Sequence, residues 1–337
     1  MFTSSSPVVC SLALFLSFCL IFFLFFISPQ DLIISPVDEL DDLHLFRRAA
    51  SAGNRRLISV SRPPPKIAFL FLTNSHLTFF PLWEKFFRGH HHLYNVYVHA
   101  DPSSSVSPTP YDSKINAQFV PAKKTARASP SLISAARRLL ARAILDDPNN
   151  LYFALVSQHC VPLHSLPYMH HHLFRQRNHR SFVEILSDEP FLRDRYDARG
   201  KDVMLPEVRY EDFRVGSQFF VMTKRHALLV IKERKLWRKF RLPCLNKNSC
   251  YPEEHYFPTL LSMEDPKGCS HYTLTRVNWT DSVGGHPHTY AAAEVSPQLI
   301  QTLRRSNSSF DFFFARKFSP DSLQPLMEMA DSIILQD

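Results

Sequence analysis

The chain has 337 residues, a formal net charge of +8 and a hydrophobic fraction of 45%, enough for one large folded domain or two small ones. Its basic residues are scattered and no RNA- or DNA-binding motif accompanies them, which argues against a nucleic-acid-binding protein. A small molecule that carries phosphate accounts for the positive charge at least as well.

The first feature along the chain is an apolar run at residues 8–27 that contains no charged side chain. At about 1.5 Å per residue, a helix of this length spans the roughly 30 Å hydrocarbon core of a bilayer. A cleaved signal peptide is the alternative, but its apolar core would be shorter and would end at a small-residue cleavage site. We expect a cytosolic tail at 1–7, a transmembrane signal-anchor at 8–27 and a stem at 28–65 that ends in three prolines.

The orientation of this anchor has to come from elsewhere, because the segment before it carries no Lys or Arg. Two N-glycosylation triplets begin at Asn278 and Asn307, and they favour a lumenal position for the rest of the chain. Outside the apolar run, four cysteines allow three disulfide pairings. We favour a disulfide near residue 250 over a zinc site, because no metal-ligand spacing is present. These cysteines are Cys160, Cys244, Cys250 and Cys269.

The folded domain is predicted to begin at residue 66. The nearly continuous apolar run at 66–73 indicates a strand buried on both faces, as in a parallel sheet. A helical stretch at 79–87 and a strand at 94–101 complete a βαβ unit, and a helix at 131–147 and a strand at 150–157 continue the alternation. This pattern predicts a three-layer α/β domain with a mostly parallel sheet. Ligands then bind beyond the carboxyl ends of the strands, where Asp101, Ser157 and Gln158 lie.

In the second half, residues 209–231 predict a loop, a strand and a helix, with Gly216 and Ser217 at the turn. The segment CYPEEHYFPTLL at 250–261 then places two adjacent carboxylates, Glu253 and Glu254, before a predicted buried helix. Acidic residues in the first turn of a helix complement its dipole, so helix capping is one interpretation. A catalytic base is the other, and the residues alone leave both open.

Seven blocks in this order resemble the Core-2/I-branching β-1,6-N-acetylglucosaminyltransferase family, particularly its plant branch. They extend over nearly all of residues 66–335: IAFLFLT, YVHADPSS, LVSQHCVPL, PEVRYEDFRVGSQFFVMTKRHA, CYPEEHYFPTLL, VNWTD with GGHPH, and FFFARKFSP. The resemblance implies a GT-A-like three-layer α/β/α nucleotide-sugar fold in one lumenal domain, residues 66–337. It also implies an inverting reaction, a UDP-sugar donor, a glycan or glycoprotein acceptor and a single-pass type II protein of the Golgi membrane.

The same resemblance implies roles for individual residues. Glu254 matches the catalytic base, with Glu253 and His255 in support. Lys317 matches a diphosphate-binding lysine, with Arg316 beside it. Further donor-binding candidates are Asp101, for which a turn or helix cap is the alternative, and Arg304. Acceptor-binding candidates are Trp279, Glu184, Arg195 and Tyr196. A glycan on Asn278 would crowd Trp279, so Asn307 is the expected glycosylation site.

No Asp-x-Asp pair occurs in the chain, and the resemblance implies catalysis without a metal or other cofactor, with basic residues in the place of the metal. The histidine runs at 90–92 and 170–172 do not indicate a metal site, because consecutive residues of a helix point about 100° apart. Transfer of N-acetylglucosamine to a sugar 6-hydroxyl is the default expectation. The altered GGHPH block at 284–288 keeps other possibilities open: UDP-glucuronic acid or UDP-xylose as donor, or a catalytically silent, membrane-anchored carbohydrate-binding protein.

Overall fold

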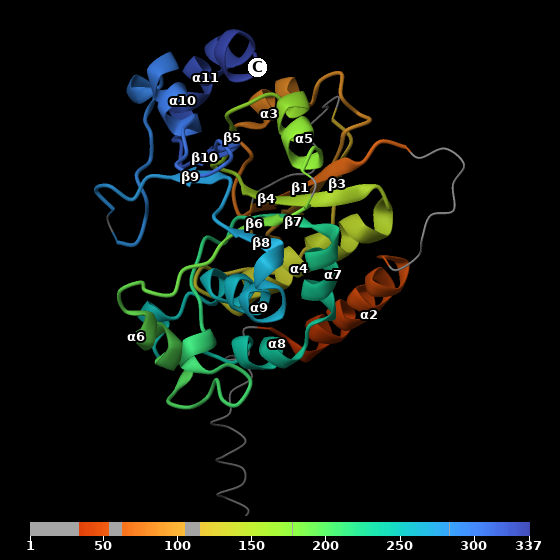
Figure 1. The fold of residues 1–337 in the computed structure, drawn as a ribbon, viewed down its shortest axis with the longest axis vertical. Coiled ribbons are helices and arrows are strands. Elements are labelled where there is room, and N and C mark those ends of the chain that lie inside the picture. The colour runs from red at the N-terminus through yellow and green to blue at the C-terminus, as the bar shows by residue number, and fades with distance from the viewer. Residues whose placement is uncertain (1–33, 54–62, 105–114, 177, 283) are drawn as a thin grey trace, which may run out of the picture.

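The computed structural model describes residues 34–53, 63–104, 115–176, 178–282 and 284–337 (Figure 1). The transmembrane segment expected at 8–27 lies outside these residues. Within the described ranges, no helix combines the length and the apolar character that crossing a membrane requires.

The predicted strands and helices of the first half are confirmed. Strands β1, β2 and β4 run parallel to one another, and the short strand β3 extends the same parallel set beyond β2. The elements are β1 (Lys66–Thr73), α3 (Phe80–Phe87), β2 (Tyr94–Ala100), β3 (Ala117–Phe119), α4 (Pro130–Asp146) and β4 (Asn150–Ser157).

The main sheet has seven strands in the order β3-β2-β1-β4-β7-β6-β8. Its second half is mixed, because β7 pairs antiparallel with both β4 and β6, whereas β6 and β8 are parallel. A smaller sheet has the order β5-β10-β9. The bounds are β5 (Val161–Pro162), β6 (Ser181–Glu184), β7 (Val221–Thr223), β8 (Cys269–His271), β9 (Thr275–Val277) and β10 (Phe314–Arg316).

Two hydrophobic clusters cover the two faces of the main sheet, so the domain has three layers (Figure 1). Alternate residues of β1 enter opposite clusters: Leu70 lies in one, and Phe69 and Phe71 lie in the other. The first cluster contains residues of α4, α7 (Lys224–Lys232), α8 (Lys235–Phe240) and α9 (Tyr256–Glu264). The second contains residues of α3, α5 (Leu166–Phe174), α10 (Pro297–Arg304) and α11 (Leu323–Met329). This mixed α/β architecture fits the GT-A-like expectation.

The structure differs from expectation in the segment assigned to the stem. Residues 36–53 form helix α2 (Pro36–Gly53), which packs on α4 and α7. Its buried residues Asp42, Phe46 and Ala49 follow helical spacing. The Asp42 carboxylate accepts two hydrogen bonds from the buried guanidinium of Arg138, at 2.5 and 2.8 Å. This part of the segment therefore belongs to the folded body.

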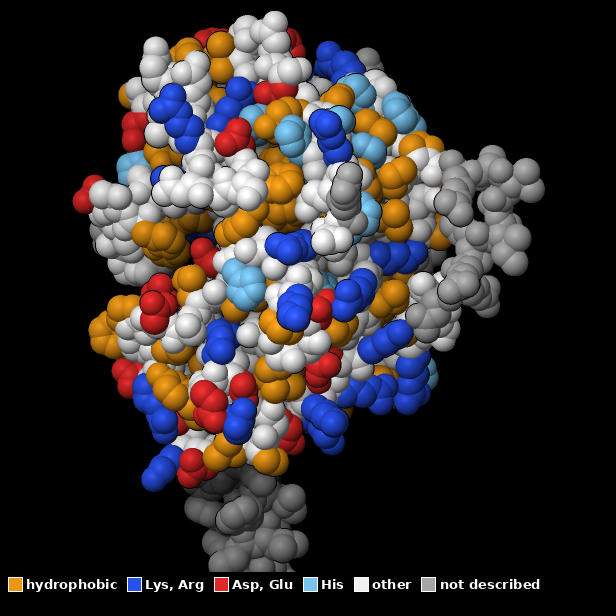
Figure 2. All heavy atoms as spheres, viewed as in Figure 1, with side chains coloured by type: hydrophobic (Ala, Val, Ile, Leu, Met, Phe, Trp, Pro, Cys, Tyr) orange, Lys and Arg blue, Asp and Glu red, His pale blue; other side chains and the backbone are white. Residues whose placement is uncertain are grey.

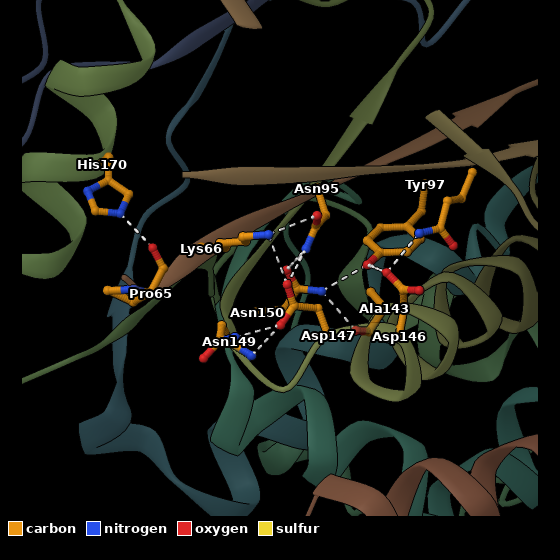
Figure 3. A network of polar contacts seen from close by, with 11 residues as sticks. Pro65, Lys66, Asn95, Tyr97, Ala143, Asp146, Asp147, Asn149, Asn150 and His170 are labelled. Atoms are coloured by element: carbon orange, nitrogen blue, oxygen red, sulfur yellow. Dashed lines mark hydrogen bonds and ion pairs between the residues drawn. The ribbon is translucent and has the colours of Figure 1, made fainter. Parts of the chain in front are cut away.

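A polar network ties the amino ends of the parallel strands together (Figure 3). The amide of Asn95 donates to Asp147 and to Asn150 at 3.0 and 2.9 Å, and Lys66 forms an ion pair with Asp147. Asn150 in turn donates to the carbonyl oxygen of Ala143 in α4. The network fixes the end of the sheet opposite to the one where a ligand is expected.

The histidine runs have structural contacts. His170 lies with Nε2 2.8 Å from the carbonyl oxygen of Pro65 (Figure 3), and the ring of His172 packs on Tyr168. In the described parts of the chain, His, Cys, Asp and Glu form no cluster of three or more that could hold a metal ion.

Candidate active site

Two adjoining cavities lie beyond the carboxyl ends of the parallel strands, where the sheet topology predicts a ligand. The larger has a volume of about 830 Å³ and the smaller about 280 Å³. Asn74, which follows β1, lines both, whereas Ser157 and Gln158 at the end of β4 line the smaller one. Figure 2 shows the surface hollowed at left, between the loop that follows β9 and the loop that leads to α6 (Leu192–Tyr196). The residues common to both cavities are Asn74, Arg127, Leu132, Gln218, Arg316 and Lys317.

The two adjacent glutamates have different environments because Pro252–Glu254 form a 3-10 turn before α9. The Glu254 side chain is 32% exposed and lines the larger cavity, and its Oε2 lies 2.7 Å from Nη1 of Arg195. Glu253 is only 4% exposed. Both glutamates precede α9, whose first turn contains no acidic residue, and the N-cap residue His255 makes no side-chain cap hydrogen bond.

The Glu253 carboxyl links the turn to the start of α4. Its Oε1 accepts a hydrogen bond from the backbone N–H of Ala128 at 2.9 Å, and its Oε2 has no hydrogen-bond partner among the described atoms. Burial, with a contribution from the charge of Glu254, raises the pKa of Glu253 to about 7. Both glutamates line the larger cavity, Glu253 as a buried carboxyl held by Ala128 and Glu254 as the more exposed carboxylate.

His255 contacts Arg195 as a neutral ring. Burial lowers the pKa of His255 to about 3, so its Nδ1–H donates to the carbonyl oxygen of Arg214 at 2.8 Å. Nε2 is then the acceptor that faces Nη1 of Arg195 at 3.5 Å. The imidazole also stacks on Phe213, with ring centroids 4.5 Å apart.

Strand β10 brings two cations to the wall that the cavities share. The guanidinium of Arg316 lies 4.5 Å above the ring of Phe219, and burial lowers the pKa of Arg316. Lys317 follows it. Burial and the nearby charges of Arg316 and Arg127 lower the pKa of Lys317 to about 8. Positive charge is thus concentrated where the cavities meet.

Sequence reasoning missed Arg127 and His286. Nη1 of Arg127 lies 2.9 Å from Nε2 of His286, and its Nη2 donates to the carbonyl oxygen of Gly285 at 3.2 Å. Arg127 just precedes the start of α4, where Ser129 is the N-cap. A helix N-terminus at the carboxyl edge of a parallel sheet is a common site for anionic ligands, and that position was the signal available in the sequence.

Asp101 holds the wall of the smaller cavity and lines neither cavity itself. It is 3% exposed. Its Oδ1 accepts hydrogen bonds from the N–H and hydroxyl of Ser103, and its Oδ2 accepts those of Thr125. Burial acts to raise the pKa of Asp101, but these four hydrogen bonds outweigh it and lower the pKa to about 2. Asp101 therefore makes the hydrogen bonds of the turn that the sequence offered as the alternative.

Two predicted site residues, Arg304 and Tyr196, line neither cavity. Arg304 donates to the carbonyl oxygens of Leu163, Ile333 and Ile334, so it fastens the last turns of the described chain. Tyr196 is buried, and its hydroxyl donates to the carbonyl oxygen of Val208. Arg304 was a candidate because it lies near Lys317 in the sequence, whereas Tyr196 was carried over from the family resemblance.

The other acceptor-binding candidates do come together. Trp279, Glu184 and Arg195 all line the larger cavity, and the Trp279 side chain is 56% exposed. Burial raises the pKa of Glu184. Asn278, beside Trp279, is partly buried and accepts a hydrogen bond from the N–H of Thr280.

The remaining sequence features concern the cysteines and the second glycosylation triplet. Cys244 and Cys250 form a disulfide, directly before the cavity-lining Tyr251, whereas Cys160 and Cys269 are buried free thiols. Asn307 is exposed. The disulfide therefore braces the loop around residue 250, as expected.

Two comparisons with known proteins bear on the identity of this chain. The family model described as Core-2/I-Branching enzyme matches residues 67–304, which include the glutamate turn and Trp279. Among curated proteins, "Glycosyltransferase BC10" of Oryza sativa subsp. japonica is 26% identical, and the similarity covers 79% of this chain and 76% of that protein.

Proposed function

From the premise that this chain belongs to the Core-2/I-branching enzyme family and is a glycosyltransferase, we propose that it transfers a sugar, with inversion, from a UDP-sugar to a glycan hydroxyl. One observation carries this proposal: a partly exposed carboxylate and a pair of cations line the same cavity. Glu254 supplies the carboxylate, and Arg316 and Lys317 supply the cations.

The arrangement of the cavities supports a position for the donor. The smaller cavity has the volume for a nucleoside, and the larger one has room for the transferred sugar and the acceptor. The diphosphate would then lie at the shared wall, between Arg127, Arg316 and Lys317. Trp279 offers a flat apolar face to an acceptor sugar at the other side of the larger cavity.

In the proposed step, Glu254 is the general base. Arg195 engages its Oε2, so Oε1 would take the proton from the acceptor hydroxyl. As that O–H bond breaks, the acceptor oxygen forms a bond to C1 of the donor sugar. The bond from C1 to the β-phosphate oxygen breaks at the same time, and UDP leaves with the electron pair. A base in this position contributes roughly 10²- to 10⁴-fold to the rate.

The leaving UDP gains negative charge, and we propose that Lys317 and Arg316 stabilise it without a metal ion. A unit charge about 4 Å from a phosphate contributes up to about 4 kcal/mol at an effective dielectric near 20. Loss of one such group would cost about 10²- to 10³-fold in rate.

N-acetylglucosamine is the proposed donor sugar, with a β-1,6 branch as the product. A second candidate donor is UDP-glucuronic acid, because Arg276 also lines the larger cavity and could pair with a sugar carboxylate. We also retain the proposal of a single-pass type II protein of the Golgi membrane, anchored by residues 8–27. Exposure of Asn307 is compatible with glycosylation of a lumenal domain.

The test is an incubation of the full chain with a panel of UDP-sugars and glycan acceptors in EDTA, with UDP release as the measurement. We expect release from one donor, and loss of about 10²- to 10³-fold in Lys317→Ala. UDP binding without release from any donor would contradict the proposal and favour a silent carbohydrate-binding protein. A requirement for Mn²⁺ would contradict the metal-independent mechanism.

A further inference from the structure

His286 lies between two cations at the wall that the cavities share. It follows Gly284 and Gly285, which have φ angles of +57° and +70°, so the backbone turns there in a conformation that favours glycine. The ring is exposed toward the larger cavity. Its Nδ1 lies 3.1 Å from Nζ of Lys317, and its Nε2 lies 2.9 Å from Nη1 of Arg127.

The contact with Arg127 indicates which nitrogen of this imidazole carries the proton. A guanidinium can only donate, so the contact with Arg127 requires Nε2 of His286 to be an acceptor. The single proton of a neutral ring must then be on Nδ1. The nearby charge of Lys317, followed by burial and the charges of Arg127 and Arg316, lowers the pKa of His286. A second proton is therefore disfavoured.

In this state, the contact between His286 and Lys317 brings two hydrogen-bond donors together and contains no acceptor. Nδ1–H is a donor, and a protonated lysine amine can only donate as well. The charged groups around this contact are Arg127 and Arg316, and His159 lies within electrostatic range of Lys317. Of the carboxylates that line the larger cavity, Glu254 pairs with Arg195 and Glu253 accepts a hydrogen bond from Ala128. An anion placed between Nδ1 and Nζ would satisfy both donors.

We propose that His286 binds the diphosphate of the nucleotide donor directly: as a neutral ring whose tautomer Arg127 fixes, it donates Nδ1–H to a phosphate oxygen beside the ammonium group of Lys317. This inference rests on the proposed function, since it takes the diphosphate of a UDP-sugar as the anion. It assigns Arg127 two tasks, to orient His286 through Nε2 and to add positive charge at the wall.

A change of protonation accompanies binding in this scheme. Without ligand, the pKa of Lys317 is about 8, so at pH 8 about half of the molecules carry an uncharged amine there. The diphosphate favours the charged form, so binding at pH 8 would take up about half a proton. His286 remains neutral and contributes no uptake. If His286 instead bound as an imidazolium, the total would rise to about one and a half protons.

The test uses UDP as the probe with the full chain at pH 8, by calorimetry in two buffers of different ionisation enthalpy, which reports affinity and proton uptake together. His286→Ala removes the donor, whereas His286→Asn keeps an N–H group close to the place of Nδ1. His288→Ala is the matched control, because His288 lies on the same loop but pairs with Glu294 and lines neither cavity.

We expect His286→Ala to bind UDP about 10- to 100-fold more weakly, His286→Asn to recover part of that loss, and His288→Ala to match the wild type. Equal affinity of wild type and His286→Ala would overturn the inference and leave the proposed function intact. Uptake of more than one proton would overturn the neutral tautomer. A wild-type chain that does not bind UDP would refute the proposed donor class itself, and the inference with it.

Discussion

Replacement of Asp101 by Asn tests whether this buried carboxylate is an anchor for the cavity wall. Both carboxylate oxygens accept hydrogen bonds, and each receives one from a backbone N–H group, that of Ser103 or of Thr125. An asparagine keeps one acceptor oxygen and turns an amide N–H group toward the other backbone donor. Two donors then face each other in a site that is 3% exposed, so Asp101→Asn should destabilise the fold.

The size of the effect follows from the pKa of Asp101. Burial opposes ionisation, but the hydrogen bonds lower the pKa from 3.8 to about 2, which corresponds to about 2 kcal/mol in favour of the folded state. A lowered carboxyl pKa stabilises the protein fully above the unfolded value near 4, and this stability is lost as the pH falls through 2. We expect Asp101→Asn to lower the free energy of unfolding by about 2–3 kcal/mol at pH 7 and by less at pH 3.

Urea denaturation at pH 7 and pH 3 measures this difference, and calorimetry with UDP measures ligand affinity at pH 7. Thr125→Val is the comparison variant, because it removes only one hydroxyl donor to Asp101. UDP affinity of folded Asp101→Asn should stay close to the wild-type value, since Asp101 lines neither cavity. Unchanged stability together with a large loss of UDP affinity would refute the anchor role and indicate a direct donor contact.

Three further predictions follow from buried and perturbed groups. Asp42→Ala should lower the free energy of unfolding by about 3–5 kcal/mol, because it leaves Arg138 buried without its carboxylate. Asp41→Ala, at the exposed neighbouring position, should lower it by less than about 1 kcal/mol. Equal effects of the two substitutions in urea denaturation would show that α2 is not docked. The kcat/KM for the donor should fall as the pH rises through about 8, where Lys317 loses its charge. Lys317→Arg should move this fall to higher pH, because an arginine keeps its charge. A pH–rate profile that does not move would assign the fall to another group. Because the pKa of Glu253 is raised, its proton stabilises the fold fully below pH 4.5, and this stability is lost as the pH rises through 7. Glu253→Gln should therefore have a free energy of unfolding a few kcal/mol above that of the wild type at pH 8 and almost the same as the wild type at pH 5. Thermal unfolding that shows the same difference at both pH values would contradict this.

The sequence predicted the half of the sheet whose strands are long. Strands β1, β2 and β4 are buried on both faces, so apolar residues follow one another without interruption. β6, β7 and β8 are three or four residues long, too short for a periodic pattern, and of these only β7 was predicted, as the strand within residues 209–231. Helix α2 was taken for part of a stem because the burial of Asp42 depends on Arg138, which is 96 positions away.

Site residues that belong to a short sequence motif could be predicted. Site contacts between residues far apart in the sequence could not. The resemblance placed Glu254 and Lys317 at the site, and both line the larger cavity. The split between Glu253 and Glu254 depends on the 3-10 turn and on the contact with Ala128, which sequence spacing does not report. Arg127 was missed because its partner His286 is 159 positions away.

The central claim is that Glu254 removes the proton of the acceptor hydroxyl. The most direct test compares the sugar-transfer rates of Glu254→Gln and Glu253→Gln with that of the wild-type full chain, at saturating donor and acceptor. We predict that Glu254→Gln lowers kcat by about 10²- to 10⁴-fold while UDP affinity is retained, and that Glu253→Gln, which keeps the Oε1 acceptor for Ala128, loses far less. A Glu254→Gln variant that transfers sugar at close to the wild-type rate would contradict the assignment of the base.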